Sequence, residues 1–485
     1  MASAGVRPIK RGGRDLTSGA IAPTLLLFAL PTLGSNILQS LNGSINAIWV
    51  GRYLGEGALA ATSNANLIMF LMYAGVFGFG MAATILVGQA IGRGDVDTAR
   101  RSLGTAIGLL VGGACVIATL GWIFAPILLK LLATLPAVQH LALTYLRVVF
   151  LSMPAAFLTV LLMMGLRGTG DSMTPLWFMA LSAVLDSGLN PILIAGWGPI
   201  PALGIAGSAL ASLIAGQVGL TALLVTIYVR DLPIRLRGSE WRYLIPDAAL
   251  LRTILAKGTP LGLQMLVVSI SGLASIGLVN LQGLVTTAAY GVALQIWTYI
   301  QMPAMAVGAA VSAMAAQNIG AGRWDRIGSI TRAGVVINLF LTGGMVLVTT
   351  WVDRAVLGLF LTQGSPAIAV AAHIHLIVGW SFMMFGVTMV LFSTVRANGA
   401  VMAPLLILAG TMLPVRLGFA YALVPVLGVD ALWWSFPVGS AVSLALAIGY
   451  YWRGSWRRGA MLTPVVAPHA TLADGEPAGR DCPTG

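Results

Sequence analysis

The chain has 485 residues, of which 58% are hydrophobic and only 9% are charged, and its formal net charge is +12. A typical soluble domain carries about 25% charged residues, so this composition excludes a soluble globular protein and indicates an integral membrane protein. The basic excess first suggests a nucleic-acid-binding protein, but the placement of the basic residues, described below, excludes that partner.

Apolar stretches of about 20 residues, the length that crosses a bilayer as a helix, recur along the whole chain. Long runs rather than short alternating segments predict helices instead of a β-barrel. Six spans are expected in the first half, near residues 20–44, 60–86, 101–122, 140–163, 174–196 and 205–229. Six more are expected in the second half, near residues 254–278, 287–313, 331–351, 368–392, 401–424 and 432–452. The predicted fold is an all-α polytopic membrane protein with twelve transmembrane helices.

The pattern of spans and polar stretches divides the chain into five parts. We expect a cytoplasmic amino-terminal segment, a six-helix bundle, a cytoplasmic linker, a second six-helix bundle and a disordered cytoplasmic tail, at residues 1–19, 20–230, 231–253, 254–452 and 453–485. If the amino terminus is cytoplasmic, only Arg52, Lys130 and Arg354 fall in loops on the opposite side. This is the positive-inside bias, so both termini should face the cytoplasm, with contact to anionic membrane lipid as a by-product.

Two sequence landmarks occur once in each half. The run G-Q-A-I-G-R-G-D at 88–95 matches A-Q-N-I-G-A-G-R at 316–323 with an offset of 228, and the run at 165–176 matches the run at 394–405 with an offset of 229. After six spans the second copy enters the membrane in the same orientation as the first. Parallel repeats of this kind enclose a central cavity. The glycines of the first landmark are expected to cap helices and turn the chain, with gating as the alternative.

Asp186 is the only acidic residue that falls deep within a predicted span. A carboxylate in a bilayer costs several kcal/mol, so such residues usually serve an ion or a substrate. Asn190 follows one turn later on the same helix face. Gln39, Asn42 and Asn46 form a stripe on the first span that is expected to face the bundle interior with Asp186. The alternative is that all of these side chains only hold helices together.

Other polar or helix-breaking residues in the spans are harder to assign. His373 and His375 open the tenth span and are expected to lie at headgroup level on different faces, with proton sensing as the alternative. Arg147 and Arg416 are expected to extend to the outer interface. Pro31 falls inside the first span, where a proline makes either a static bend or a hinge.

Motifs of membrane-bound enzymes are missing from the chain. It has no G-x-x-x-x-G-K-[ST] phosphate loop, no H-E-x-x-H and no G-x-S-x-G, and it has no acidic or Cys/His cluster of the kind that holds a metal. We therefore expect a protein that is not an enzyme and that has neither a cofactor nor a bound metal.

Several of these runs resemble one family. The segment L-P-T-L-G-S-N-I-L-Q-S-L-N-G at 30–43, the G-Q-A-I-G-R-G-D run, the segment at 165–176 and N-P-I-L-I-A-G-W-G-P-I-P-A-L-G at 190–204 are similar to multidrug and toxic compound extrusion (MATE) transporters, and the likeness runs from about residue 20 to 452. The resemblance implies two bundles of six helices, alternating access, and export of cationic, lipophilic compounds against inward H⁺ or Na⁺ flow.

The resemblance also implies roles for individual residues. Pro31 matches the family's first-helix proline, which bends in the proton-coupled branch, and Gln39 matches a polar cavity position. Asn46 stands where the family often has an Asp. In the fifth helix the proton-coupled branch has the pattern N-x-x-x-D-P. This chain has Asp186 at the position of the Asn and Asn190 at the position of the Asp. Ser212 takes the place of a Thr, and the second-half carboxylates of the sodium-coupled branch have no counterpart.

The sequence therefore predicts a secondary-active multidrug exporter in the bacterial inner membrane, acting as a monomer. Asp186, Asn190 and Asn46 would couple the ion, with H⁺ favoured over Na⁺. The substrate would contact a polar set made of Gln39, Asn42, Asn46, Asp186 and Ser212. One alternative is a flippase for lipid-linked sugars or other amphiphiles of the same wider superfamily. An alternative of another class is a passive channel or a non-transporting membrane scaffold.

Overall fold

The computed structural model describes residues 14–131, 136–197, 201–351 and 365–459, together with Leu357 and Met461. Eleven helices of this part of the chain are long and apolar enough to cross a membrane, and a bent pair of helices brings the number to twelve. The prediction of an all-helical protein with twelve spans is confirmed.

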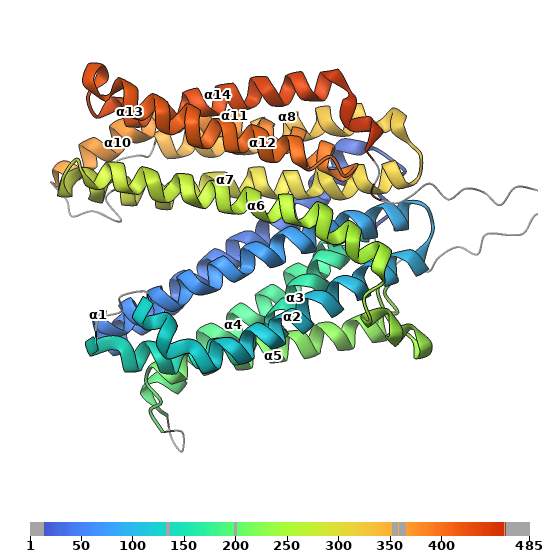
Figure 1. The fold of residues 1–485 in the computed structure, drawn as a ribbon, viewed down its shortest axis with the longest axis horizontal. Coiled ribbons are helices and arrows are strands. Elements are labelled where there is room, and N and C mark those ends of the chain that lie inside the picture. The colour runs from blue at the N-terminus through green and yellow to red at the C-terminus, as the bar shows by residue number, and fades with distance from the viewer. Residues whose placement is uncertain are drawn as a thin grey trace, which may run out of the picture.

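The amino-terminal half contains five helical elements, which are drawn in blue to green in Figure 1. They are α1 (Ile21–Gly92), α2 (Val96–Leu131), α3 (Pro136–Gly168), α4 (Met173–Ala195) and α5 (Ile205–Val229). Non-helical backbone at Gly55, with φ of 77°, divides α1 into two helices. The two resulting spans are Ile21–Gly55 and Met72–Gly92, so this half has six spans.

The carboxy-terminal half repeats this pattern with more interruptions. Its elements are α6 (Ala248–Asn280), α7 (Leu284–Gly320), η2 (Trp324–Arg326), α8 (Ile327–Trp351), α10 (Pro366–Val378), α11 (Ser381–Ala397), α12 (Met402–Gly410), the π-helical turn η3 (Thr411–Val415), α13 (Arg416–Leu427), α14 (Asp430–Arg453) and η4 (Ser455–Arg458). The helices α10 and α11 form one span with a bend of 44°. Many helices extend beyond their predicted spans because a hydropathy window detects only the apolar part of a helix.

The two halves form separate bundles that meet at one end of the molecule and diverge toward the other (Figure 1). The meeting end carries the first and last described segments of the chain, and we call it the terminal end. Helices α1 and α7 make the most extensive contact between the halves. Small buried residues line this contact, including Ala82 and Ala83 of α1 and Ala313 and Ala316 of α7. Small side chains let transmembrane helices approach closely, which explains the tight packing here.

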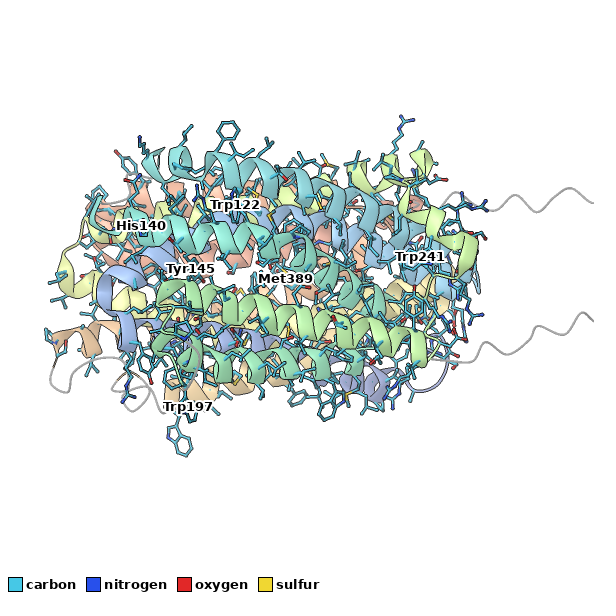
Figure 2. All side chains as sticks on the ribbon, turned by 90° about the horizontal axis from the view of Figure 1, so that it is seen from below. Trp122, His140, Tyr145, Trp197, Trp241 and Met389 are labelled. Atoms are coloured by element: carbon cyan, nitrogen blue, oxygen red, sulfur yellow. The ribbon has the colours of Figure 1, made fainter. Side chains whose placement is uncertain are left out.

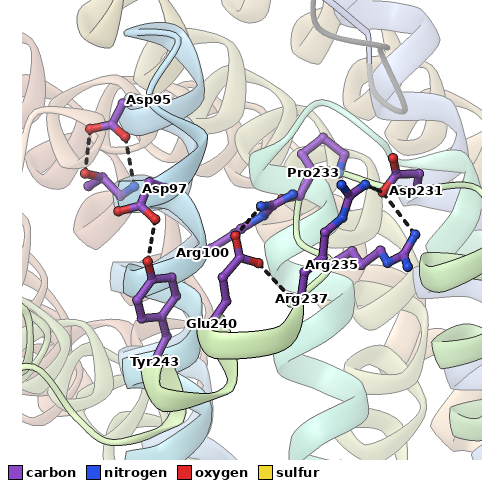
Figure 3. A network of polar contacts seen from close by, with 10 residues as sticks. Asp95, Asp97, Arg100, Asp231, Pro233, Arg235, Arg237, Glu240 and Tyr243 are labelled. Carbon is purple, nitrogen blue, oxygen red and sulfur yellow. Dashed lines mark hydrogen bonds and ion pairs between the residues drawn. The ribbon is translucent and has the colours of Figure 1, made fainter.

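The chain between the bundles is held against the amino-terminal bundle by polar contacts (Figure 3). It includes the short helix η1 (Gly238–Leu244), whose Tyr243 hydroxyl donates to the Asp97 carboxylate at 2.6 Å. Arg100 of α2 forms an ion pair of 2.7 Å with Glu240. Arg100 also donates from Nε to the Pro233 carbonyl at 3.0 Å. The segment predicted as a linker is therefore fixed on α2.

Two surface tryptophans lie in opposite halves of the molecule along its long axis (Figure 2). Trp241, in η1, lies at the terminal end, and Trp197, after α4, lies toward the opposite end. Both side chains are exposed. Tryptophan is enriched where a membrane protein crosses the headgroup region. The placement therefore fits a molecule whose long axis runs along the membrane normal.

Candidate functional site in the amino-terminal bundle

Asp186 lies on α4 inside the amino-terminal bundle and is only 3% exposed. Its Oδ2 accepts a hydrogen bond from Asn42 Nδ2 of α1 at 2.9 Å. Its Oδ1 accepts from Asn190 Nδ2 at 3.1 Å and from the Ser212 hydroxyl of α5 at 2.9 Å. Three helices therefore converge on one carboxylate, and all three partners are neutral donors. Among the residues that the structure describes, Asp186 has no ion pair.

The local sequence explains this arrangement. Asp186 and Asn190 are four residues apart on α4, so their side chains share a helix face. Asn190 Nδ2 also donates to the main-chain carbonyl of Asp186 at 3.0 Å, which fixes the amide beside the carboxylate. An ionised carboxylate accepts hydrogen bonds and donates none, so the three donors satisfy the charged form. The buried amide oxygens of Asn42 and Asn190 have no hydrogen-bond partner in the described structure.

A second polar layer lies beside this one and is centred on Asn46, one helical turn from Asn42. The Ser208 hydroxyl donates to Asn46 Oδ1 at 2.8 Å. The Tyr145 side chain of α3, which is 4% exposed, lies close to the Asn46 side chain. The sequence prediction missed Ser208 and Tyr145. Ser208 and Ser212 are spaced by four residues on α5, a signal that could have identified Ser208, whereas nothing in the sequence marks Tyr145.

The structure does not bring Gln39 into this cluster. Gln39 is exposed, and within the described part of the chain its side chain makes no hydrogen bond to Asp186 or to its partners. Asn42 and Asn46 face the bundle interior, as their helical spacing predicts, whereas Gln39 lies one turn before Asn42 and is exposed. Its role as a substrate contact stays a prediction. Pro31 is buried within a continuous stretch of α1, and Ser35 Oγ donates to its carbonyl at 3.0 Å. Its hinge role stays a prediction.

The histidines and arginines divide into confirmed and corrected predictions. His373 and His375 do lie on different faces: His373 is exposed and pairs with Asp430 at 3.0 Å, whereas His375 is 3% exposed. Arg147 stacks over the Trp122 ring at 5.7 Å. The prediction for Arg416 is wrong. Its guanidinium lies inside the carboxy-terminal bundle, 3.4 Å from the centroid of the Phe436 ring, and not at an outer interface.

The repeated Gln and Gly residues join the two bundles at the terminal end, in addition to ending their helices. Gln89 Nε2 donates to the Ala397 carbonyl of the opposite half at 2.7 Å. Gln317 Nε2 donates to the Gly168 carbonyl at 2.9 Å, again across the halves. Gly94 and Gly322 have φ of 77° and 73°, which a helix-terminating glycine adopts easily. The capping prediction is confirmed, but it missed the contact between the halves.

Comparison with known proteins identifies the family. The model of the MatE family matches residues 31–192 and 260–422. The chain is 37% identical over 434 residues to the probable multidrug resistance protein YoeA of Bacillus subtilis, covering 88% of this chain and 93% of that protein. It is 30% identical over 445 residues to the probable multidrug resistance protein YpnP of the same species, covering 91% and 97%.

Solved structures show the same fold. An outward-facing multidrug resistance MATE transporter matches with a TM-score of 0.83 and 20% identity, covering 91% of this chain and 98% of that chain. A variant of the Vibrio cholerae MATE transporter VcmN matches with a TM-score of 0.81 and 21% identity, covering 90% and 97%. Since the family model matches once in each half and a relative is 37% identical over most of the chain, this protein belongs to the multidrug and toxic compound extrusion (MATE) family.

Proposed function

We propose that this protein is a secondary-active multidrug exporter that works by cation antiport, with H⁺ favoured over Na⁺. The observation that carries the proposal is the Asp186 carboxylate, buried in the amino-terminal bundle and held by donors from three helices. A static helix–helix bond does not need a charge, and a charge in this position is costly. The names of relatives such as YoeA support the drug-export part of the proposal.

Alternating access supplies the conformational cycle. In this structure the bundles meet at the terminal end and diverge at the other end (Figure 1). With both termini in the cytoplasm of a bacterial inner membrane, this is the outward-facing state. An ion gradient drives export only if the ion and the substrate favour different conformations. A ligand with equal affinity for both conformations does not change the equilibrium between them. Protonation of Asp186 would replace one acceptor by a donor in a cluster that spans α1, α4 and α5.

The composition of the cluster favours H⁺ over Na⁺. Asp186 is the only carboxylate in the group that Asn42, Asn190 and Ser212 complete. A proton needs one oxygen of that carboxylate and one acceptor nearby, and an amide oxygen of Asn42 or Asn190 can supply the acceptor after rotation. A metal cation needs several oxygen ligands at once, and more than one acid usually helps to balance its charge.

The remaining parts of the proposal concern substrate and assembly. Small-molecule drugs are the proposed substrates, which the names of the multidrug resistance relatives support, and cationic, lipophilic compounds are the class proposed from the family resemblance. Asn42, Asn46, Asp186 and Ser212 are the proposed polar contacts, with Gln39 at the exposed edge of the same helix. The functional unit is proposed to be a monomer in contact with membrane lipid.

Transport in proteoliposomes tests the function. Protein would be reconstituted with rhodamine 123, a fluorescent cation, and given either a pH gradient or a Na⁺ gradient. We expect dye to accumulate against its own gradient when the pH gradient is imposed, and Asp186→Asn to abolish that accumulation. The matched control is Asp325→Asn, because the Asp325 side chain is 69% exposed. Full activity of Asp186→Asn would overturn the coupling assignment, and dye that only equilibrates would indicate a channel.

A further inference from the structure

The carboxy-terminal bundle contains a cavity of about 360 Å³ that the Asp186 cluster does not touch. It lies between α6, α7, α11 and the α12–α14 region, and Phe77 of α1 contributes to its wall. Met389, one of its lining residues, lies near the middle of the long axis of the molecule (Figure 2). Its volume is within the range of small-molecule sites.

Aromatic rings form one wall of this cavity. Trp297 packs against Phe436 with a centroid distance of 5.1 Å and against Phe382 at 5.6 Å. Tyr290 packs edge-on against Trp297 at 5.8 Å. Phe385 extends the wall beyond Phe382 at 6.5 Å. These rings fix one another, so they offer a rigid apolar surface to a flat ligand.

Two arginines face the same cavity. Arg396 is 7% exposed, and its guanidinium donates to the Gln264 side-chain oxygen. Arg416 donates to the Ser275 hydroxyl at 3.1 Å and stacks on Phe436. The Nε groups of both arginines are buried without a hydrogen-bond partner in the described structure. None of the described residues that line the cavity is an Asp or a Glu, so both positive charges lack a counter-charge from the protein.

The backbone before Arg416 departs from regular helix. Thr411–Val415 is a single π-helical turn that contains Pro414 and separates α12 from α13. Such turns are rare and frequently mark functional sites, since the inserted residue shifts the direction of the side chains that follow. Here the turn directly precedes Arg416, whose guanidinium enters the cavity. Stacking on Phe436 covers one face of the guanidinium and leaves N–H groups at its edge available for a planar anion.

The internal repeat shows that the two bundles carry opposite charges in corresponding places. At the repeat offset of 229 residues, Arg416 corresponds to Ser187, the neighbour of Asp186. Ser275, which accepts from Arg416, corresponds to Asn46 by the same offset. At adjacent positions of the repeat, the amino-terminal bundle therefore carries a carboxylate, that of Asp186, and the carboxy-terminal bundle carries a guanidinium, that of Arg416.

We propose that the cavity of the carboxy-terminal bundle binds aromatic anions, with Arg416 and Arg396 contacting the carboxylate or sulfonate and the Tyr290–Trp297–Phe436 wall contacting the rings. Burying an unpaired cation is unfavourable, and an anionic ligand offsets part of that cost. A cationic compound would meet two uncompensated positive charges. The significance of the site for transport rests on the proposed exporter function, to which it adds a second class of substrate.

Equilibrium binding to protein in lipid nanodiscs, without any gradient, tests this site. The probes are fluorescein, an anion, and rhodamine 123, a cation with the same xanthene ring system, followed by fluorescence anisotropy. We expect fluorescein to bind more tightly than rhodamine 123. In Arg416→Gln its affinity should fall at least 10-fold, whereas Arg416→Lys should retain part of it. Arg147→Gln is the matched control, because Arg147 belongs to the other bundle.

A second measurement uses the unaltered protein, in case Arg416→Gln does not fold. 2-Naphthalenesulfonate should displace fluorescein, and the neutral 2-naphthalenemethanol should not. Equal displacement by both compounds, unchanged fluorescein binding in folded Arg416→Gln, or no fluorescein binding at all would overturn the proposal. Asp186→Asn separates this proposal from the transport function, because it should abolish gradient-driven efflux while leaving fluorescein binding intact.

Discussion

Gln89 and Gln317 make the same hydrogen bond in opposite directions across the two bundles. Gln89 donates to Ala397, and Gln317 donates to Gly168, which corresponds to Ala397 at the repeat offset of 229. The backbones beside them also touch, because a Cβ at Gly320 would overlap the Gln89 carbonyl and a Cβ at Gly92 would overlap the Gln317 carbonyl. The repeat therefore produces a nearly symmetric closure of the terminal end.

Removal of the two glutamine side-chain amides should loosen this closure. Gln89→Leu and Gln317→Leu each leave a buried carbonyl without its donor, at a cost of about 1–3 kcal/mol. We expect the terminal ends of the bundles to separate more in the double variant than in either single variant. The measurement is the distance between spin labels at Arg230→Cys and Arg453→Cys, both exposed, in a background without Cys115 and Cys482.

Gln217→Leu is the control for this experiment, since Gln217 is exposed on α5. The label distance in this variant should equal that of the parent protein. If the double variant also keeps the parent distance distribution, the two hydrogen bonds do not hold the terminal end closed.

The close approach at Gly320 gives a second prediction. Gly320→Ala should destabilise the contact by about 1–3 kcal/mol, the usual cost of overpacking, because the new methyl group meets backbone and not a flexible side chain. The backbone of Gly320 is not in the left-handed region, so the conformation itself accepts alanine. The measurement is the thermal unfolding temperature in detergent.

Gly112→Ala is the comparison for Gly320→Ala. A Cβ at Gly112 of α2 has nothing within 4 Å, so only the intrinsic helix preference changes, and that favours alanine by about 0.5–1 kcal/mol. The two variants should thus shift the unfolding temperature in opposite directions. A Gly320→Ala protein as stable as Gly112→Ala would show that the interface adjusts without cost.

The sequence carries most of the information for the fold and part of that for the site. Hydropathy is sufficient for the spans because lipid forces every spanning segment to satisfy its backbone internally. Spacing on one helix places Asp186 with Asn190 and turns Asn42 inward. It cannot show which helices surround each turn of α1, and Gln39, one turn before Asn42, is exposed and makes no hydrogen bond to the carboxylate.

Contacts between distant segments were the main information missing from the sequence. Tyr145 reaches Asn46 from a helix whose register against α1 no local pattern reports. Arg416 enters the carboxy-terminal bundle instead of extending to the outer interface, because the preceding π-helical turn shifts the direction of the side chains that follow it. The cross-bundle bonds of Gln89 and Gln317 are invisible to a reading of one helix at a time, although their repetition marked the positions.

Asp247 should stabilise the start of α6 in a pH-dependent way. Its carboxylate accepts from the N–H groups of Ala249 at 3.0 Å and Leu250 at 3.2 Å, and it pairs with Arg101 of α2 at 2.8 Å. The hydrogen bond from Leu250, followed by that from Ala249 and the charge of Arg101, holds the pKa of Asp247 below its ordinary value. Asp247→Ala should destabilise the protein by about 1 kcal/mol at neutral pH, as for the loss of other helix caps.

The sign of the pH effect follows from this lowered pKa. The folded protein binds the proton of Asp247 more weakly than the unfolded chain, so the stabilisation is complete above the unfolded pKa of about 3.9. It is lost as the pH falls through the lower folded value. The unfolding temperatures of the parent and Asp247→Ala proteins, followed by tryptophan fluorescence, should therefore differ by a constant amount between pH 8 and pH 5 and converge in stronger acid.

Asp247→Asn keeps an oxygen acceptor for the cap, so its destabilisation should be smaller and nearly independent of pH. A difference between parent and Asp247→Ala that grows on acidification would contradict this account of the linker.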